Sequence, residues 1–206
     1  MPGCTLLYRP VGMKELELIF DSGMRSYPPR LPEQPIFYPV LNTQYARQIA
    51  KDWNSKADTF AGYVTRFTID YGYIRRFEEK TVGGREHKEL WVNAKDLEEF
   101  NGKIFGPIEV TDSFFGDGFV GMLPAFGFSK AANADDFFNR LEATLDYNGM
   151  DFSGSICMNS KSIFINYPYW KQKFTEPKAV AVIERMKWVW DRNYPSVRLP
   201  GEVQFP

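Results

Sequence analysis

The sequence predicts an α+β fold, in which short strands dominate the first half of the chain and helices become more frequent in the second. Short apolar or alternating segments recur between residues 5 and 110, and segments with helical apolar spacing lie between and after them. Hydrophobic residues make up 44% of the 206 residues and aromatic residues 17%, which is enough for a packed core. The composition therefore favours a folded protein over a disordered one.

The first predicted elements are a strand and a helix. The strand is the apolar run from Thr5 to Arg9, which we expect to end at Pro10. Residues 13–23 follow with the apolar spacing of a helix that stops at its terminal glycine. The expected buried face of this helix consists of Leu16, Ile19 and Phe20. A proline-rich loop, residues 26–35, leads to the next element.

A second strand and helix are expected over residues 36–53. Residues 36–42 read as a short strand, and Asn42 or Thr43 can cap the helix that follows. The apolar stripe of this helix consists of Tyr45, Ile49 and Trp53. Residues 62–70 then alternate as a strand with one solvent-exposed face does.

The remainder of the first half contains a polar connection and three further elements. Residues 73–84 form the connection, and residues 89–92 form the next strand. A short helix over residues 94–102 is followed by a strand over residues 103–110. Pro107 predicts that this last strand lies at a sheet edge or contains a bulge.

The composition and the periodicity of the sequence change in the second half. We therefore divide the chain into a domain of residues 1–113 and a region of residues 114–206. The stretch around this boundary is rich in glycine and phenylalanine and has no clear period. A helix capped by Asn133 is expected next, and residues 153–167 read as a β-hairpin. A last helix, opened by Pro177, completes a helix–hairpin–helix arrangement.

Several functional classes find no support in the sequence. The formal net charge of −1 does not favour nucleic acid as a partner. The first residues lack a signal peptide, and no apolar stretch reaches membrane-spanning length, so we expect a cytoplasmic protein that does not bind membranes. One histidine, Cys4 and Cys157 do not suffice for a zinc site, and both thiols are expected to be buried and reduced. The glycine motif at residues 116–121 is followed by Pro124 where a dinucleotide-binding helix should open, so we interpret it as a loop.

Arg9 and Tyr38 are ambiguous when taken alone. Arg9 ends an apolar strand just before a proline, from where a guanidinium can reach across a cleft to a phosphate or ribose. A surface position or an internal ion pair is the alternative for Arg9. Tyr38, near a strand end, is suited either to the core or to stacking on a planar ring.

His87, the single histidine, and Glu89 stand at the beginning of a short apolar strand. Residues two apart in a strand point to the same face, so the imidazole and the carboxylate should lie beside whatever binds there. A surface position at the strand end is the alternative for Glu89.

The order of these residues resembles that of the ADP-ribosyltransferase fold. The segments that carry the resemblance are "LLYRPVG", "PPRLPEQPIFYPVLNTQYARQIAKDWN", "GYVTRF" and "GGREHKELWVNAKDLEEFNGKIFGPIEV". They are similar to a group of bacterial ADP-ribosylation proteins over Thr5 to Val110, that is, over the first half of the chain only. The resemblance implies a split β-sandwich of two small sheets with flanking helices, and a cleft for NAD between the sheets.

The resemblance also implies roles for individual residues. Arg9 would anchor the ribose or phosphate of NAD, and Tyr38 would occupy the second-strand position of the family. Glu89 would bind the hydroxyls of the nicotinamide ribose, and His87 would orient the acceptor. Tyr8 and Tyr45 complete the set of residues expected to bind NAD. The chain departs from the family pattern because it lacks the Ser-Thr-Ser of many members and has histidine where others have Glu or Gln.

The function implied is cleavage of the bond between nicotinamide and ribose, with NAD consumed as a substrate. ADP-ribose would pass to an unknown acceptor, a protein or a small molecule, or to water. One alternative is a non-catalytic module of the same fold in which Arg9 and Glu89 pair with each other. Another is a structural or immunity-type protein that uses its aromatic second half as an interface.

Overall fold

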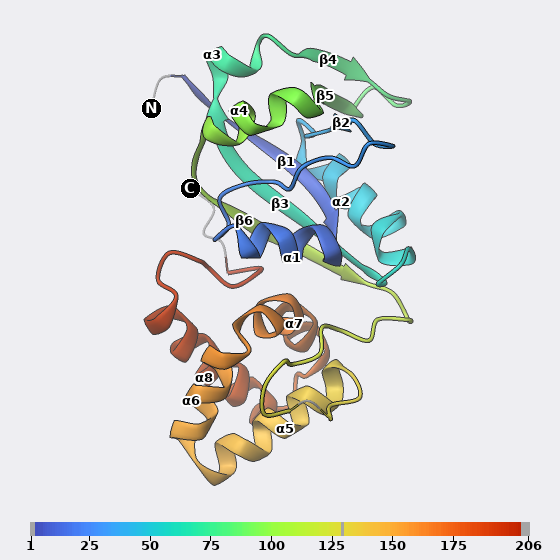
Figure 1. Ribbon diagram of the computed structural model, residues 1–206. Helices are drawn as coiled ribbons and strands as arrows, with labels where there is room; N and C mark the ends of the chain where they lie inside the picture. Colours follow the sequence, from blue (N-terminus) through green and yellow to red (C-terminus); the bar gives the residue numbers. More distant parts are fainter. Residues whose placement is uncertain (1–2, 129, 203–206) are drawn as a thin grey trace. The chain divides into compact units, whose positions relative to one another are not determined.

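The computed structural model describes residues 3–128 and 130–202. The chain divides into two compact units, Met1–Gly116 and Asp117–Pro206. The first unit contains two antiparallel three-stranded sheets with helices, and the second is helical (Figure 1). The predicted α+β class is therefore confirmed.

One sheet of the first unit has the strand order β1-β3-β6. Its strands are β1 (Cys4–Gly12), β3 (Ala61–Asp70) and β6 (Ile104–Phe115). The prediction that one face of β3 is exposed to solvent is wrong, because both faces are covered. Val64 packs against helix α2 (Thr43–Asp52) on one face, and on the other Phe67 packs against the rings of Tyr27 and Phe100.

The two edge strands of this sheet accommodate proline in different ways. Strand β1 continues past Pro10 to Gly12, so the predicted end of the first strand is wrong. An edge strand tolerates a residue that cannot donate a backbone hydrogen bond. The prediction for Pro107 is confirmed, since β6 is the other edge and its register with β3 shifts between Arg66 and Thr68.

The second sheet has the order β2-β5-β4 and meets β1 through a single residue. Its strands are β2 (Ile36–Phe37), β4 (Glu78–Thr81) and β5 (Lys88–Asn93). Val40, beyond the end of β2, forms isolated bridges to Tyr8 of β1 and to Glu89 of β5. The backbone hydrogen bonds between Val40 and Tyr8 measure 3.0 and 2.7 Å. The segment after β2 therefore lies between β1 and β5.

Strand β4 and the helices of the first unit differ in part from the predictions. The expected polar connection, residues 73–84, contains the end of α3 (Tyr71–Ile74) and the whole of β4. Helices α1 (Met13–Asp21) and α4 (Leu97–Gly102) lie where helices were expected. Helix α2 buries Tyr45, Ala46 and Ala50, whereas Trp53 is 54% exposed because the helix ends before it.

The second unit consists of four helices over its described residues. They are α5 (Ala134–Tyr147), α6 (Gly149–Met158), α7 (Ser160–Lys173) and α8 (Pro177–Asn193). The predicted hairpin over residues 153–167 is wrong. Helix α7 is buried on nearly all sides, and a helix without a polar face carries no periodic signal that distinguishes it from buried strands.

Two asparagines fasten the loop before α5: Asn166 of α7, and Asn159, which lies between α6 and α7. The Asn166 side chain bonds to the backbone N–H and C=O of Met122 at 2.9 and 2.7 Å, and Asn159 does the same for Phe126 at 3.0 Å each. The glycine motif at residues 116–121 thus belongs to a loop, as predicted. Among the helices of the described residues, none combines the length and the apolar character required to cross a bilayer.

Candidate functional site

The candidate site lies where the two sheets meet. Tyr8 and Glu89 are both bridged to Val40 in antiparallel register, and residues directly opposite each other project from the same face. Tyr8 packs, half-buried, against the cluster that Val40 forms with Tyr45 of α2. Glu89 and the Tyr8 ring therefore lie on the face that α2 covers in part.

The Glu89 carboxylate is held by two donors. Tyr45 Oη donates to Oε1 at 2.9 Å, and Trp91 Nε1 donates to Oε2 at 3.2 Å. Tyr45 reaches this position because Asn42 caps α2 by accepting from the Tyr45 N–H at 2.7 Å. Glu89 is half-buried, so its carboxylate is both oriented and accessible.

The Tyr45 phenol remains a donor over a wide pH range. Burial, the hydrogen bond to Glu89 and the charge of Glu89 raise the pKa of Tyr45 to about 12. The Tyr45 ring also stacks on the His87 ring, with 4.2 Å between centroids and an angle of 10° between planes. His87 and Glu89 thus contact the same tyrosine.

His87 also stabilises the turn that precedes β5. Its Nδ1 lies 3.1 Å from the Val82 carbonyl oxygen and 3.3 Å from the Gly84 amide nitrogen. Asn42 Nδ2 donates to the Glu86 carbonyl of the same turn at 2.5 Å. The turn that carries His87 is thus tied to the beginning of α2.

Trp91 belongs to this site, although the sequence interpretation missed it. It follows Glu89 by two residues on β5, so strand alternation places both side chains on the same face. Lys80 Nζ lies 3.8 Å from the centroid of the Trp91 ring, and the Tyr38 ring meets Trp91 edge-on at 5.4 Å. Five rings and one carboxylate therefore gather here, contributed by Tyr8, Tyr38, Tyr45, His87, Trp91 and Glu89.

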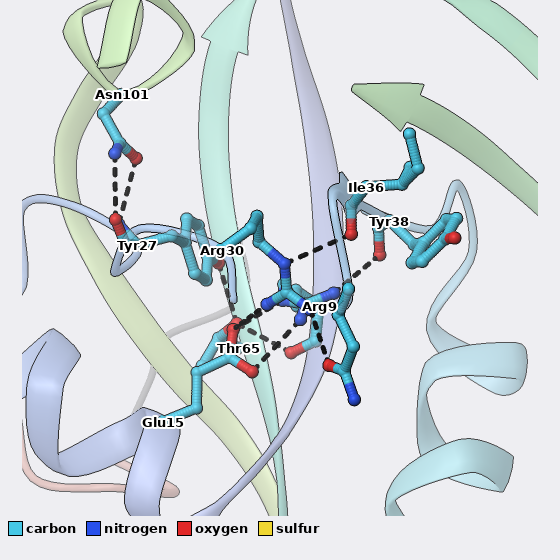
Figure 2. A network of polar contacts seen from close by, with 9 residues as sticks. Arg9, Glu15, Tyr27, Arg30, Ile36, Tyr38, Thr65 and Asn101 are labelled. Carbon is cyan, nitrogen blue, oxygen red and sulfur yellow. Dashed lines mark hydrogen bonds and ion pairs between the residues drawn. The ribbon is translucent and has the colours of Figure 1, made fainter. Parts of the chain in front are cut away.

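Arg9 lies on the opposite face of β1, because it follows Tyr8 in the strand. Figure 2 shows its guanidinium bound to both oxygens of Glu15, with Nε–Oε1 at 2.7 Å and Nη2–Oε2 at 3.1 Å. Nη1 donates to the Tyr38 carbonyl at 3.2 Å, and the Phe37 ring lies 4.7 Å away. The Arg9 side chain is 9% exposed. The structure thus forms an internal ion pair, which was the alternative for Arg9.

A second guanidinium shares the same carboxylate. Arg30 Nη1 lies 3.9 Å from Glu15 Oε1, and Arg30 Nε donates to the Ile36 carbonyl (Figure 2). Burial and the nearby Arg9 lower the pKa of Arg30. The two arginines and Glu15 fasten α1 and the segment before Val40 to β1.

The predicted site residues are therefore divided between two faces. Tyr8, Tyr38, Tyr45, His87 and Glu89 come together, and Arg9 does not join them. The pairing of Arg9 with Glu89, expected for a non-catalytic module, is wrong because Arg9 pairs with Glu15. Tyr38 contacts residues of both groups, because its ring lies against Trp91 and its carbonyl accepts a hydrogen bond from Arg9.

An oriented carboxylate among aromatic rings is suited to hydroxyl groups and to developing positive charge. Carboxylate oxygens accept hydrogen bonds from ribose hydroxyls, and aromatic faces stack on planar rings. Within residues 3–128 and 130–202, no three side chains of His, Cys, Asp or Glu gather as a metal site would require. Comparisons of the chain with models of protein families, with curated proteins and with solved structures found no match.

Proposed function

We propose that the first unit is an ADP-ribosyltransferase-like split β-sandwich that binds NAD on the face around Glu89. In this proposal it cleaves the bond between nicotinamide and ribose and passes ADP-ribose to an acceptor or to water. One observation carries the proposal: Glu89 is half-buried and held by Tyr45 and Trp91 among aromatic rings. The sequence resemblance over Thr5 to Val110 supports the same role for this glutamate.

The chemistry requires an anionic group beside the ribose. Nicotinamide leaves with the electron pair of the broken bond, and positive charge develops on the ribose carbon as in glycoside hydrolysis. A carboxylate fixed next to that carbon stabilises the transition state more than it stabilises bound NAD. An oxygen or nitrogen of the acceptor then forms the new bond and loses its proton. His87, at the edge of the site, is the group proposed to orient that acceptor.

Arg9 enters the proposal as a positioning residue. It bonds to the Tyr38 carbonyl and so helps to fix the segment that runs on to Val40, between β1 and β5. Direct contact between Arg9 and NAD stays a prediction, and it would require the guanidinium to leave Glu15. Lys80 is opposite Glu89 in the sheet, and its ammonium lies over Trp91 on the Glu89 face.

A second candidate function is a non-catalytic binding module of the same fold. The observation that favours it is the engagement of Arg9 by Glu15 and by a backbone carbonyl, which leaves this guanidinium little exposed. This candidate predicts that titration with NAD gives neither heat nor thermal stabilisation.

The test is release of nicotinamide from NAD by the wild type, Glu89→Gln and Glu79→Gln. Glu79 is a matched control because it lies on neighbouring β4 opposite Leu90, and therefore on the other face. We expect kcat to fall by about 100-fold or more in Glu89→Gln and to be retained in Glu79→Gln. Equal release by the two variants, or absence of release together with absence of NAD binding, would contradict the proposal.

A further inference from the structure

A hollow of about 450 Å³ lies at the β2-β5-β4 sheet, lined by residues of all three strands. Strand β5 contributes Trp91 and Asn93 to its lining, and the turn after α3 contributes Arg76 and Phe77. The remaining polar groups of the lining are the carboxylates of Glu78 and Asp96. Trp91 lines the hollow and also donates to Glu89, so it connects the two sites.

The walls of the hollow are suited to a flat ligand. Trp91 and Phe77 present aromatic rings, and the planar Arg76 guanidinium packs 4.9 Å from the Phe77 centroid. Lys80 lies 3.8 Å from the centroid of the Trp91 ring but is not among the residues that line the hollow. Aromatic faces and a guanidinium plane stack on the flat face of any nucleobase, so stacking alone does not select one base.

The polar groups determine which ring fits. Within the described part of the chain, the exposed Asn93 amide makes no hydrogen bond, so its donor and its acceptor are both available. Asp96 approaches Arg76 only at 3.9 Å, and Glu78 lies 3.3 Å from Lys80. Carboxylates only accept, so they require N–H or O–H groups on the ligand, and an exocyclic amino group supplies N–H donors. The lining contains two carboxylates and one guanidinium. This excess of negative charge disfavours a phosphate group.

We infer that this hollow binds the aminopurine ring of an adenine nucleoside. An asparagine amide pairs with the amino group and N7 of adenine through two hydrogen bonds, and a carboxylate accepts from an exocyclic amino group. The volume lies within the range of small-molecule pockets. Assignment of the ring to the adenosine half of NAD rests on the proposed function, whereas a separate nucleoside would satisfy the same groups.

The test is an NMR titration of the full chain with adenosine, NAD and nicotinamide mononucleotide, which lacks adenine. In the wild type, the titration follows the side-chain signals of Asn93 and Trp91. In the variants Asn93→Ala and Lys95→Ala, it follows the signal of Trp91. Lys95 is an exposed neighbour that does not line the hollow. We expect Asn93→Ala to weaken adenosine binding about 10-fold or more. Lys95→Ala should bind adenosine as the wild type does, and binding of the mononucleotide should not change in either variant.

The outcomes separate this inference from the proposed function. Adenosine binding that depends on Asn93, without cleavage of NAD, would support the ring site and contradict the enzyme. Cleavage of NAD with no adenosine binding, or adenosine binding that Asn93→Ala leaves unchanged, would overturn the ring site alone. If adenosine and NAD compete, the ring bound in the hollow is the adenine of NAD. If both bind at once, the hollow is a site for a separate nucleoside.

Discussion

The ionisation of the Tyr45 phenol depends directly on Glu89. Burial, and then the hydrogen bond and charge of Glu89, raise the pKa of Tyr45 to about 12. We expect Glu89→Gln to lower this pKa but to leave it above 10, because burial persists. NMR titration of labelled tyrosines measures the change, and the other tyrosines serve as internal controls. An unchanged Tyr45 titration in Glu89→Gln would contradict the contact.

The same shift has a consequence for stability at high pH. Between pH 10 and about 12 the unfolded chain loses the Tyr45 proton while the folded chain keeps it. The free energy of unfolding therefore falls as the pH rises through this window, and Tyr45 adds no pH dependence below it. Other buried tyrosines also make the free energy of unfolding fall with rising pH. The contribution of Tyr45 is therefore measured as the difference in this pH dependence between the wild type and Tyr45→Phe.

The ion pair of Arg9 and Glu15 supports a second prediction at the residue scale. Glu15→Gln leaves two little-exposed guanidiniums without their shared carboxylate, and we expect it to lower the free energy of unfolding by about 3 kcal/mol. The control is Lys14→Ala, since the pair of Lys14 with Asp58 is 73% and 74% exposed and should contribute less than about 1 kcal/mol. Urea unfolding compares the two variants. Equal losses would mean that the Arg9 network does not stabilise the unit.

Part of the site can be predicted from the sequence at this scale. The sequence predicts a shared face for His87 and Glu89 by strand alternation, but His87 lies in the turn before β5 and meets the site through its stacking on Tyr45. The alternation does hold from Glu89 to Trp91 and would have found that tryptophan. The face of Arg9 could not be predicted, because it depends on Val40 pairing with Tyr8 at a distance of 32 residues along the chain. The partner of Arg9, Glu15, lies on a helix whose direction relative to the strand is set by tertiary packing.

At the scale of elements, the beginning of α2 positions Tyr45 for Glu89. Asn42 caps the helix through Oδ1 and donates through Nδ2 to the Glu86 carbonyl. Asn42→Ala loses both bonds, and we expect it to cost about 1 kcal/mol of stability. Asn42→Asp keeps the cap and loses only the donor, so it should cost much less. If urea unfolding gives equal losses for both variants, the bond to Glu86 outweighs the cap.

The errors in the predicted elements have a common physical cause. Strand β4, with the sequence Glu-Glu-Lys-Thr, carries no apolar alternation and is specified by its pairing with β5. Helices α6 and α7 lack a polar face, so local periodicity could not distinguish them from a hairpin. Elements with one buried face, such as α1 and α8, were predicted well because their apolar residues are periodic.

At the scale of the whole molecule, each unit has its own buried side chains. The first unit buries Tyr63, Phe67 and Phe100, and the second buries Phe164, Trp170 and Trp190. All residues of the proposed site lie within the first unit. In the proposed function, NAD therefore binds to the sheets of the first unit, and no step of the reaction involves the helical unit.

The most direct test of this account is NMR titration of the wild-type chain with NAD, observed at the tryptophan indole N–H groups. The chain has five tryptophans, and Trp91→Phe identifies the Trp91 signal. The Trp91 indole donates to Glu89, so NAD bound at that carboxylate should shift its signal and leave those of Trp170, Trp188 and Trp190 in place. Saturation with NAD that leaves the Trp91 signal unmoved, or that shifts only the other indoles, would contradict the account.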